Sequence, residues 1–248
     1  MTDYQNDYSK KFQLQFDPES RIPKAKKIQK IVEDFSKIPL KDCRCLDVGC
    51  STGININFLA GYARFCVGID IDLPALLYAQ THSEPDAGFL AGDALHLPFP
   101  DEFFDMVICS HIYEHVPDAQ LMMDEIYRVL KPGGFCYFAA GNKFSVIEPH
   151  YRLPFLSWLP KPAADLYLKV TKKGTTYYEK HLSYFALKRL VSRFRIIDYT
   201  LRIIKDPERF GAEDMIPANS NVCKIPGFVF QAIIPIIPTY VFILSKES

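Results

Sequence analysis

The stretch CLDVGCSTGININ, positions 45 to 57, combines residue types that suit the binding of a small ligand. Asp47 follows an apolar run, and Gly49, Ser51 and Gly53 alternate after it. Glycine lets the backbone pass close to a ligand, and the N-terminus of a following helix attracts a carboxylate or a phosphate. The turn therefore predicts a site for a small molecule that carries an anionic group.

Three further groups of polar residues follow apolar runs in the same way. Asp70 ends the run FCVGID, Asp93 ends FLAGD, and Ser110 begins the stretch SHIYEH after FFDMVIC. Asp70 lies 21 positions beyond Gly49, where its carboxylate is placed to accept hydrogen bonds from a ribose diol. If all these runs are strands of one sheet, their polar ends line one edge.

The runs do alternate with helical patterns. We expect strands at 43–48, 65–70, 89–93, 103–110, 134–140, 195–204 and 239–246, and helices at 22–35, 56–63, 74–82, 118–130 and 183–194. Buried strands that alternate with helices favour a parallel sheet with helices on both faces. Ligands of such sheets bind outside the carboxyl ends of the strands, which is where the polar residues lie.

The fold class that follows is α/β, a doubly wound, mostly parallel, seven-stranded sheet with a lid inserted between strands five and six. We expect a helical N-terminal cap at 1–39 and a cofactor-binding core at 40–142. Residues 143–182 are rich in proline, aromatic residues and lysine without a clean period, which predicts the substrate lid. Residues 183–248 supply a helix and the strands that complete the sheet.

The glycine turn does not have the spacing of a dinucleotide site, because G-x-G-x-x-G is absent and G-x-S-x-G stands in its place. The chain instead resembles the class I S-adenosylmethionine-dependent methyltransferases, which have a Rossmann-like fold, and especially the group with the C-methyltransferases of ubiquinone and menaquinone biosynthesis. The resemblance covers about residues 40 to 142, through LDVGCSTG, VGIDID, GDALHLPFPDEFFDMVICSHIYEHVPD and LKPGG.

This resemblance implies roles for the residues of the turn. The methionine part of S-adenosylmethionine would lie against Asp47, Gly49, Ser51 and Gly53, with the carboxylate of Asp47 helping to hold the ammonium group. Ser51 replaces the commoner glycine of the family pattern, so we expect either a slightly different backbone path or a shifted methionine tail.

The resemblance also implies roles at the neighbouring strand ends. Asp70 would accept from the ribose hydroxyls and Ile71 would lie against the adenine. Asp93 would accept from the adenine amino group while the Ala94 N–H meets a ring nitrogen. Ser110 and His111 would lie near the activated methyl group.

The pentapeptide HIYEH at 111–115 also matches H-x-x-E-H, the inverted zinc-protease signature. A zinc site of that kind needs a helix that carries both histidines and a third ligand downstream. Pro117 follows at once and the preceding run is a strand, so we expect no metal site. As candidate bases we take His111, Tyr113 and His115, followed by His150, Tyr151 and His181 in the lid.

Composition restricts the partners. Lysine and arginine number 29, equal to aspartate and glutamate, so no overall charge favours nucleic acid. The seven cysteines are spaced irregularly, and the sequence MTDYQNDYSKK lacks the apolar core of a signal peptide. We expect a cytoplasmic protein, with peripheral contact at the inner membrane face as an extension.

That extension rests on two segments. Residues 151–205 carry twelve lysines and arginines against three acids, together with the apolar stretch YRLPFLSWLP. Residues 225–244 hold no charge, but Pro226, Pro235 and Pro238 interrupt a spanning helix. We expect contact with an anionic membrane surface through 151–205 and 226–237, with burial inside the domain as the alternative.

The sequence thus predicts an S-adenosylmethionine-dependent methyltransferase that acts on oxygen or carbon of a small or lipid-linked acceptor. Two alternatives stay open, a non-catalytic module that binds the cofactor and an NAD(P)-dependent oxidoreductase. The amino-methylating enzymes that carry an N-P-P-Y tetrapeptide after the fourth strand are disfavoured, because that tetrapeptide is absent.

Overall fold

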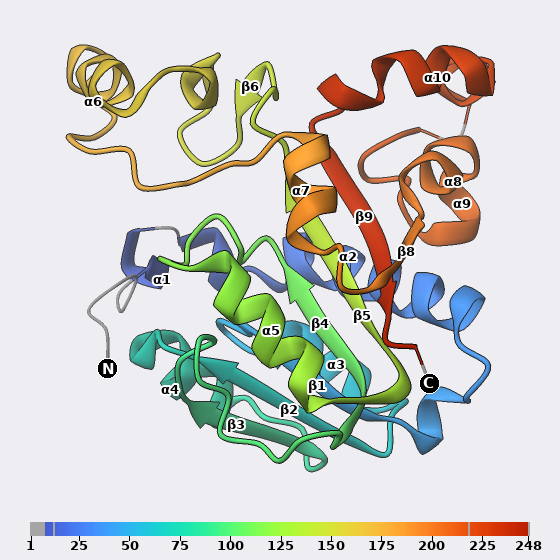
Figure 1. The fold of residues 1–248 in the computed structure, drawn as a ribbon. Helices are drawn as coiled ribbons and strands as arrows, with labels where there is room; N and C mark the ends of the chain where they lie inside the picture. Colours follow the sequence, from blue (N-terminus) through green and yellow to red (C-terminus); the bar gives the residue numbers. More distant parts are fainter. Residues whose placement is uncertain (1–7, 12, 218, 248) are drawn as a thin grey trace.

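A computed structural model describes residues 8–11, 13–217 and 219–247 of the chain. Its central element is a seven-stranded sheet with the order β3-β2-β1-β4-β5-β9-β8 (Figure 1). The strands are β1 Arg44–Val48, β2 Phe65–Asp70, β3 Ala87–Ala91, β4 Phe104–Ser110, β5 Leu130–Gly141, β8 Arg195–Asp198 and β9 Thr239–Ser245. Five neighbouring strands, β3, β2, β1, β4 and β5, are parallel, and β9 runs antiparallel to both of its neighbours. The predicted doubly wound, mostly parallel sheet is confirmed.

Helices cover both faces of this sheet. The α-helices are α1 Tyr8–Lys11, α2 Pro18–Phe35, α3 Ile54–Ala60, α4 Leu73–Thr81, α5 Ala119–Val129, α6 Lys161–Val170, α7 Tyr184–Leu190, α8 Thr200–Lys205, α9 Pro207–Phe210 and α10 Gly227–Ile233. The 3₁₀ helices are η1 Gln13–Phe16, η2 Leu40–Asp42, η3 Leu156–Trp158, η4 Asn221–Lys224 and η5 Ile234–Ile236. Helices α5 and α7 pack on one face, while α2, α3, α8 and α9 pack on the other.

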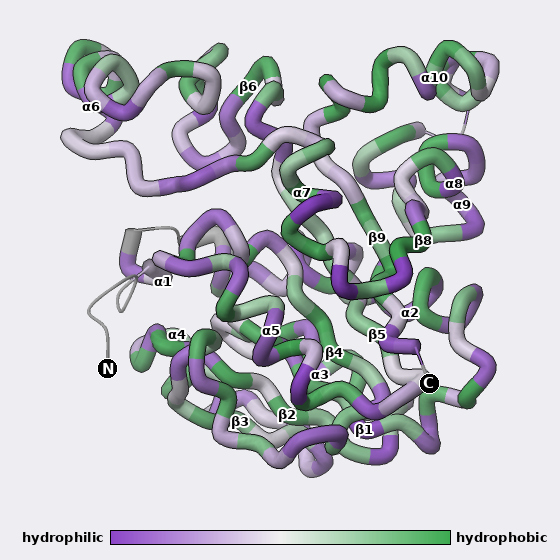
Figure 2. Tube along the Cα trace, viewed as in Figure 1, coloured by the Kyte–Doolittle hydropathy of each residue, from purple (hydrophilic) through white to green (hydrophobic). Residues whose placement is uncertain are grey.

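The two faces hold separate apolar cores because strands buried on both sides are hydrophobic along their length. Figure 2 shows mostly hydrophobic colour along the central parts of β4, β5 and β9. On one side Met122 and Ile126 of α5 pack with Leu187 of α7. On the other side the side chains of Ile28 and Ile31 of α2 are at most 2% exposed. Helix α2 is therefore a layer of the sheet and not only a cap at its edge.

Side-chain caps fix where several helices begin. The carboxylate of Asp118 accepts the Leu121 N–H at 3.0 Å, and that of Asp72 accepts the Ala75 N–H at 3.3 Å. The hydroxyl of Ser183 accepts the Ala186 N–H at 3.4 Å. Such caps satisfy backbone donors that have no partner within the helix.

The strand predicted over 195–204 is wrong beyond its fourth residue. Strand β8 ends at Asp198, and helix α8 starts at Thr200. The Asp198 carboxylate accepts the Thr200 N–H at 2.9 Å, which turns the chain out of the sheet and favours a helix start. A run of isoleucine and leucine fits a strand or a buried helix equally well, so the apolar pattern could not separate them.

The segment between β5 and α7 forms a small lobe beyond the sheet edge (Figure 1). It contains a two-stranded ribbon, β6 Ile147–Glu148 and β7 Leu153–Pro154, followed by η3 and α6. Leu153, Leu156, Ala164 and Leu168 pack with Tyr177 in a core of their own. The lobe is thus a separately packed unit that is inserted where the sequence predicts the lid.

The apolar segment 225–244 is divided among α10, η5 and β9. Among the described residues, no helix has the length and apolar content needed to cross a membrane. Asn142 anchors the start of β9, because its side-chain amide donates to the carbonyls of Pro235 at 2.9 Å and Ile237 at 2.8 Å. The prolines therefore act as breaks between short elements, in agreement with the expectation from sequence.

Candidate functional site

The turn after β1 is hydrogen-bonded to the end of β2. The N–H groups of Gly49 and Cys50 both donate to the Ile69 carbonyl, at 2.8 and 3.1 Å. The Ser51 N–H donates to the Asp70 carboxylate at 2.6 Å. The two predicted site segments are thereby brought together, and Asp70 has a structural role in addition to the one expected.

Three residues of this turn have left-handed backbone conformations, with φ of 75° at Gly49, 50° at Ser51 and 73° at Gly53. A side chain on Gly49 would collide with Ile112, and one on Gly53 would collide with the ring of Phe89. Glycine is therefore required at both positions by conformation and by space. Ser51 adopts a left-handed conformation that favours glycine, at a conformational cost of about 1 to 2 kcal/mol, and the effect of its side chain on the path of the turn stays a prediction.

Asp47 is a buried carboxylate with little to compensate its charge. Its side chain is 2% exposed, and it accepts a long hydrogen bond of 3.5 Å from the Asn55 amide. Burial, helped by the negative charge of Asp70, raises the pKa of Asp47 to about 7 against the opposing effects of Asn55 and Arg21. A cation placed beside Asp47 would remove this penalty.

The remaining strand ends also reach this edge of the sheet. Each Asp70 oxygen accepts one backbone N–H, from Ser51 and from Asp72, which leaves lone pairs for further donors. The Asp93 carboxylate accepts the Leu95 N–H at 2.9 Å. Ile71 and Ala94 follow these acids and are partly buried, and Ser110 ends β4 beside Ala139 of β5. The structure places all the predicted cofactor residues at the carboxyl ends of β1, β2, β3 and β4.

An N-terminal segment that the sequence did not assign to the site lies against it. The Ser9 N–H donates to the Asp72 carboxylate at 2.6 Å, and the Thr52 hydroxyl donates to the Gln15 carbonyl at 2.5 Å. The rings of Phe16 and Tyr78 meet edge to face at 5.0 Å. No periodic pattern in the sequence predicts these contacts, because they depend on the positions of the turn and of α4.

The SHIYEH block follows β4 as a set of turns. His111 has a left-handed φ of 58°, and its Nδ1 lies 3.5 Å from Oε1 of the buried Glu114. The hydroxyl of Tyr113 donates to the Gly141 carbonyl at 2.6 Å and accepts the Leu182 N–H at 3.0 Å. Tyr113 therefore ties the block to the end of β5 and to the inserted lobe, and the catalytic role expected of it stays a prediction.

His115 turns towards the inserted lobe. Its ring lies 5.0 Å from that of His150 and 5.0 Å from that of Tyr8, measured between centroids. Burial lowers the pKa of His115 to about 4 despite the opposing charge of Glu114, so the imidazole is neutral at pH 7. Of the two predicted histidines in this block, His111 is exposed to solvent, whereas His115 is partly buried against the lobe.

Two acids that the sequence did not predict, Glu148 and Glu179, form a cluster with the histidines of the block and the lobe. Glu148 and Glu179 lie 0% and 6% exposed, and Nδ1 of His150 is 2.6 Å from Oε1 of Glu148. Nε2 of His181 is 3.4 Å from the same oxygen. The sequence did hold a signal, since EPH at 148–150 and EKH at 179–181 repeat an acid two positions before a histidine.

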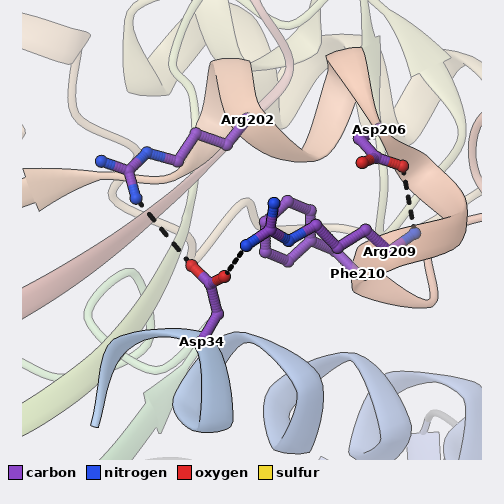
Figure 3. A pocket seen from close by; sticks show the side chains of 5 residues that line it. All are labelled: Asp34, Arg202, Asp206, Arg209 and Phe210. Atoms are coloured by element: carbon purple, nitrogen blue, oxygen red, sulfur yellow. Dashed lines mark hydrogen bonds and ion pairs between the residues drawn. The ribbon is translucent and has the colours of Figure 1, made fainter. Parts of the chain in front are cut away.

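A separate pocket lies on the far side of the sheet between α2 and the α8–α9 pair (Figure 3). Its lining is Asp34, Arg202, Asp206, Arg209 and Phe210. Asp34 pairs with Arg209, lies 3.9 Å from Arg202, and accepts the Tyr199 hydroxyl at 2.8 Å. Its carboxylate is thus already matched by these groups.

Comparison with known proteins agrees with this arrangement. Residues 46–138 match the family described as Methyltransferase domain. This segment is similar to a methyltransferase domain. It holds most of β1, all of β2, β3 and β4, most of β5 and every predicted cofactor residue.

Curated relatives extend the similarity in part. The ubiquinone biosynthesis O-methyltransferase of Thiobacillus denitrificans is 30% identical over 160 residues, which cover 62% of this chain and 65% of the relative. The enzyme of the same name from Pseudomonas entomophila is 31% identical over 151 residues, with 59% and 61% covered. The chain thus matches less than two thirds of the length of these relatives.

A solved structure confirms the fold. The S-adenosylmethionine-dependent methyltransferase structure from Methanosarcina mazei superposes with a TM-score of 0.55, at 21% identity, and covers 88% of this chain and 97% of its own. The match thus covers a larger part of the chain than the 46–138 segment.

S-adenosylmethionine is the cofactor that this family implies, and the residues present fit it. Asp47 supplies a buried carboxylate in need of a cation, and Asp70 keeps acceptor capacity for hydroxyl groups. Nearby, Ser51 Oγ, Asn55 Oδ1 and Gln15 Oε1 are buried with no hydrogen-bond partner among the described residues. Unmatched polar atoms around one turn are expected where a polar ligand completes the site.

The substitution Asp47→Asn should change how stability depends on pH. The folded-state pKa of about 7 lies above the ordinary value of 3.8, so between these values the folded chain holds a proton that the unfolded chain has lost. The free energy of unfolding then falls as pH rises, by about 2 to 3 kcal/mol between pH 5 and 7. The neutral amide removes this contribution.

Urea unfolding without cofactor at pH 5, 6 and 7 measures the effect. We expect Asp47→Asn to gain stability over the wild type as pH rises, whereas the exposed Asp86→Asn should follow the wild-type slope. Parallel slopes for Asp47→Asn and the wild type would contradict the raised pKa.

Proposed function

We propose that the protein is an S-adenosylmethionine-dependent methyltransferase that methylates oxygen or carbon of a small or lipid-linked acceptor. The observation that carries the proposal is the uncompensated carboxylate of Asp47, which lies beside a turn whose conformation requires Gly49 and Gly53. Bound cofactor would supply an electrophilic methyl group on its sulfonium. The protein then has to hold the two reactants in line, which is worth on the order of 7 to 11 kcal/mol.

In this proposal Asp47, Gly49, Ser51 and Gly53 hold the methionine part. The nucleoside part is held by Asp70, Ile71, Asp93 and Ala94, and the methyl group faces Ser110 and His111. The positions of these residues at adjoining strand ends support the assignment.

Oxygen is the acceptor atom we favour, because the curated relatives are named as O-methyltransferases of ubiquinone biosynthesis. That name suggests a quinone-type ring on a lipid tail as the acceptor class. The inserted lobe at 143–182 lies beyond the strand ends, where it would cover the acceptor (Figure 1). The proposal thus includes the N-terminal cap at 1–39 and the substrate lid at 143–182 that the sequence predicts.

Methylation of a hydroxyl group releases a proton, and His111 is the base that we favour. Its side chain is 44% exposed, whereas that of Glu114 is fully buried and lies within 3.5 Å of Nδ1. A carboxylate in that position orients the imidazole, so that the other ring nitrogen accepts the proton. A base of this kind contributes about 10² to 10⁴-fold to the rate.

Two substitutions separate binding from turnover. Asp70→Asn should weaken S-adenosylmethionine binding at least about tenfold, because it removes a charged acceptor from the ribose (about 1.4 kcal/mol). His111→Gln should leave binding within about twofold and lower turnover at least about 100-fold. Calorimetry measures the first effect, and transfer of labelled methyl groups to a lipid extract, followed by mass spectrometry, measures the second.

The alternatives predict other outcomes. A non-catalytic module would bind the cofactor without labelling any acceptor, and a nicotinamide-dependent oxidoreductase would bind NAD(P) instead. The proposal is lost if wild-type protein shows no micromolar affinity for S-adenosylmethionine. Exposed Asp86→Asn serves as the control for both measurements.

We also propose that the protein contacts the inner membrane face through two segments, 151–205 and 226–237. Leu166 and Val170 of α6 are 61% and 71% exposed, and Phe228 of α10 is 75% exposed. Exposed lysines at 169, 172 and 173 adjoin the α6 residues. Helices α6 and α10 lie at the same end of the molecule, beyond the edge that holds the candidate site (Figure 1).

Flotation with vesicles that contain anionic lipid tests this contact. We expect co-migration that weakens with salt, because the lysines contribute by charge. The double variant Val170→Ser and Phe228→Ser should float less, whereas Leu77→Ser, at a 64% exposed position on α4, should behave as the wild type. Equal flotation of all three proteins, or none, would refute the contact.

A further inference from the structure

Side chains from three distant parts of the sequence converge between the domain and the inserted lobe. His115 comes from the turn after β4, His150 follows β6, and Glu179 precedes α7. One nitrogen or oxygen from each lies within 4.8 Å of the others. Donors this close in space and this far apart in sequence form a potential metal-ligand set.

The cluster already contains the supporting contact that metal-binding histidines usually have. Nδ1 of His150 lies 2.6 Å from the Glu148 carboxylate, which also accepts the Tyr151 N–H at 2.8 Å. A carboxylate that accepts from one ring nitrogen fixes the tautomer and directs the other nitrogen to a metal. Glu148 is fully buried, so this contact is maintained without competition from water.

Several polar atoms of the cluster lack partners. Glu179 is 94% buried and its Oε2 makes no hydrogen bond within the described chain, and the same holds for His115 Nδ1. Glu114 and Glu148 add two further buried carboxylates. Buried acids without matching donors are costly, and a bound cation would offset that cost.

We propose that His115, His150 and Glu179 bind a divalent first-row transition metal, with Glu148 orienting His150 through its Nδ1. Two imidazoles and one carboxylate suit zinc or ferrous iron better than magnesium or calcium, which prefer oxygen ligands. Three protein ligands leave a position open for an exchangeable ligand. The proposal concerns metal binding and stands whether or not the protein transfers methyl groups.

A second set, Glu148, His150 and His181, satisfies the same distance limit. We favour the first set because Glu148 is already occupied by His150 and Tyr151, whereas Glu179 Oε2 is not. The zinc-protease reading of HIYEH is a different site. The stretch 111–115 is not helical, and His111 faces Glu114 while His115 meets the lobe.

Metal uptake by the full chain provides the test. Chelator-treated protein is titrated with Zn²⁺ against a coloured chelator, and the ligand-field spectrum of bound Co²⁺ reports the geometry. We expect one equivalent of Zn²⁺ bound with micromolar or tighter affinity and a Co²⁺ spectrum typical of four or five ligands.

Variants then locate the site. His150→Ala and Glu179→Gln should each weaken Zn²⁺ binding at least about 100-fold, and Glu148→Gln, which removes only the supporting contact, about 10 to 100-fold. His82→Ala, at an exposed position, and His181→Ala should bind as the wild type. Circular dichroism checks that each variant is folded.

Three results would overturn the proposal. If wild-type protein takes up no Zn²⁺ at micromolar concentration, the site does not exist, whatever the variants do. If uptake survives both His150→Ala and Glu179→Gln, the metal is bound adventitiously elsewhere. Loss of uptake in His181→Ala but not in Glu179→Gln would assign the site to the second set and refute the first.

Discussion

The hydrogen bonds between the turn after β1 and the end of β2 are the constraint on which the site depends. Backbone donors of Gly49, Cys50 and Ser51 end on Ile69 and Asp70, so the turn cannot move without disturbing two parallel strands. The turn adopts left-handed conformations to make these bonds, and the glycines follow from that need. Residues that would contact the cofactor are therefore held by the sheet and not by a mobile loop.

The opposite side of the site is built by a different principle. Tyr113 is a buried residue of the SHIYEH block, which follows β4. Its one hydroxyl group bonds to the end of β5 and to the end of the inserted lobe. Around it, histidines and acids from the block and the lobe face one another without apolar separation. The side with the turn is thus fixed by backbone pairing, whereas the side with the lobe is fixed by side-chain networks.

Sequence patterns were sufficient for the sheet and for the edge at which its polar strand ends meet. Buried parallel strands are continuous apolar runs, and the acids that end them, Asp47, Asp70 and Asp93, mark their carboxyl ends. The pattern failed at 199–204, where Asp198 starts a helix within an apolar run. It also could not assemble His115 with Glu148 and Glu179, because periodicity reports which face of an element is buried and not which distant element packs there.

The inserted lobe has a small core of its own, in which Leu153, Leu156 and Leu168 pack with Tyr177 and contribute nothing to the two cores of the sheet. Its packing can therefore change without a change in the packing of the sheet. During divergence, such a lobe can be lengthened, replaced or lost while the sheet keeps its stability. Relatives with the same cofactor edge can in this way acquire different acceptors, and alignments are expected to fade where the lobe begins.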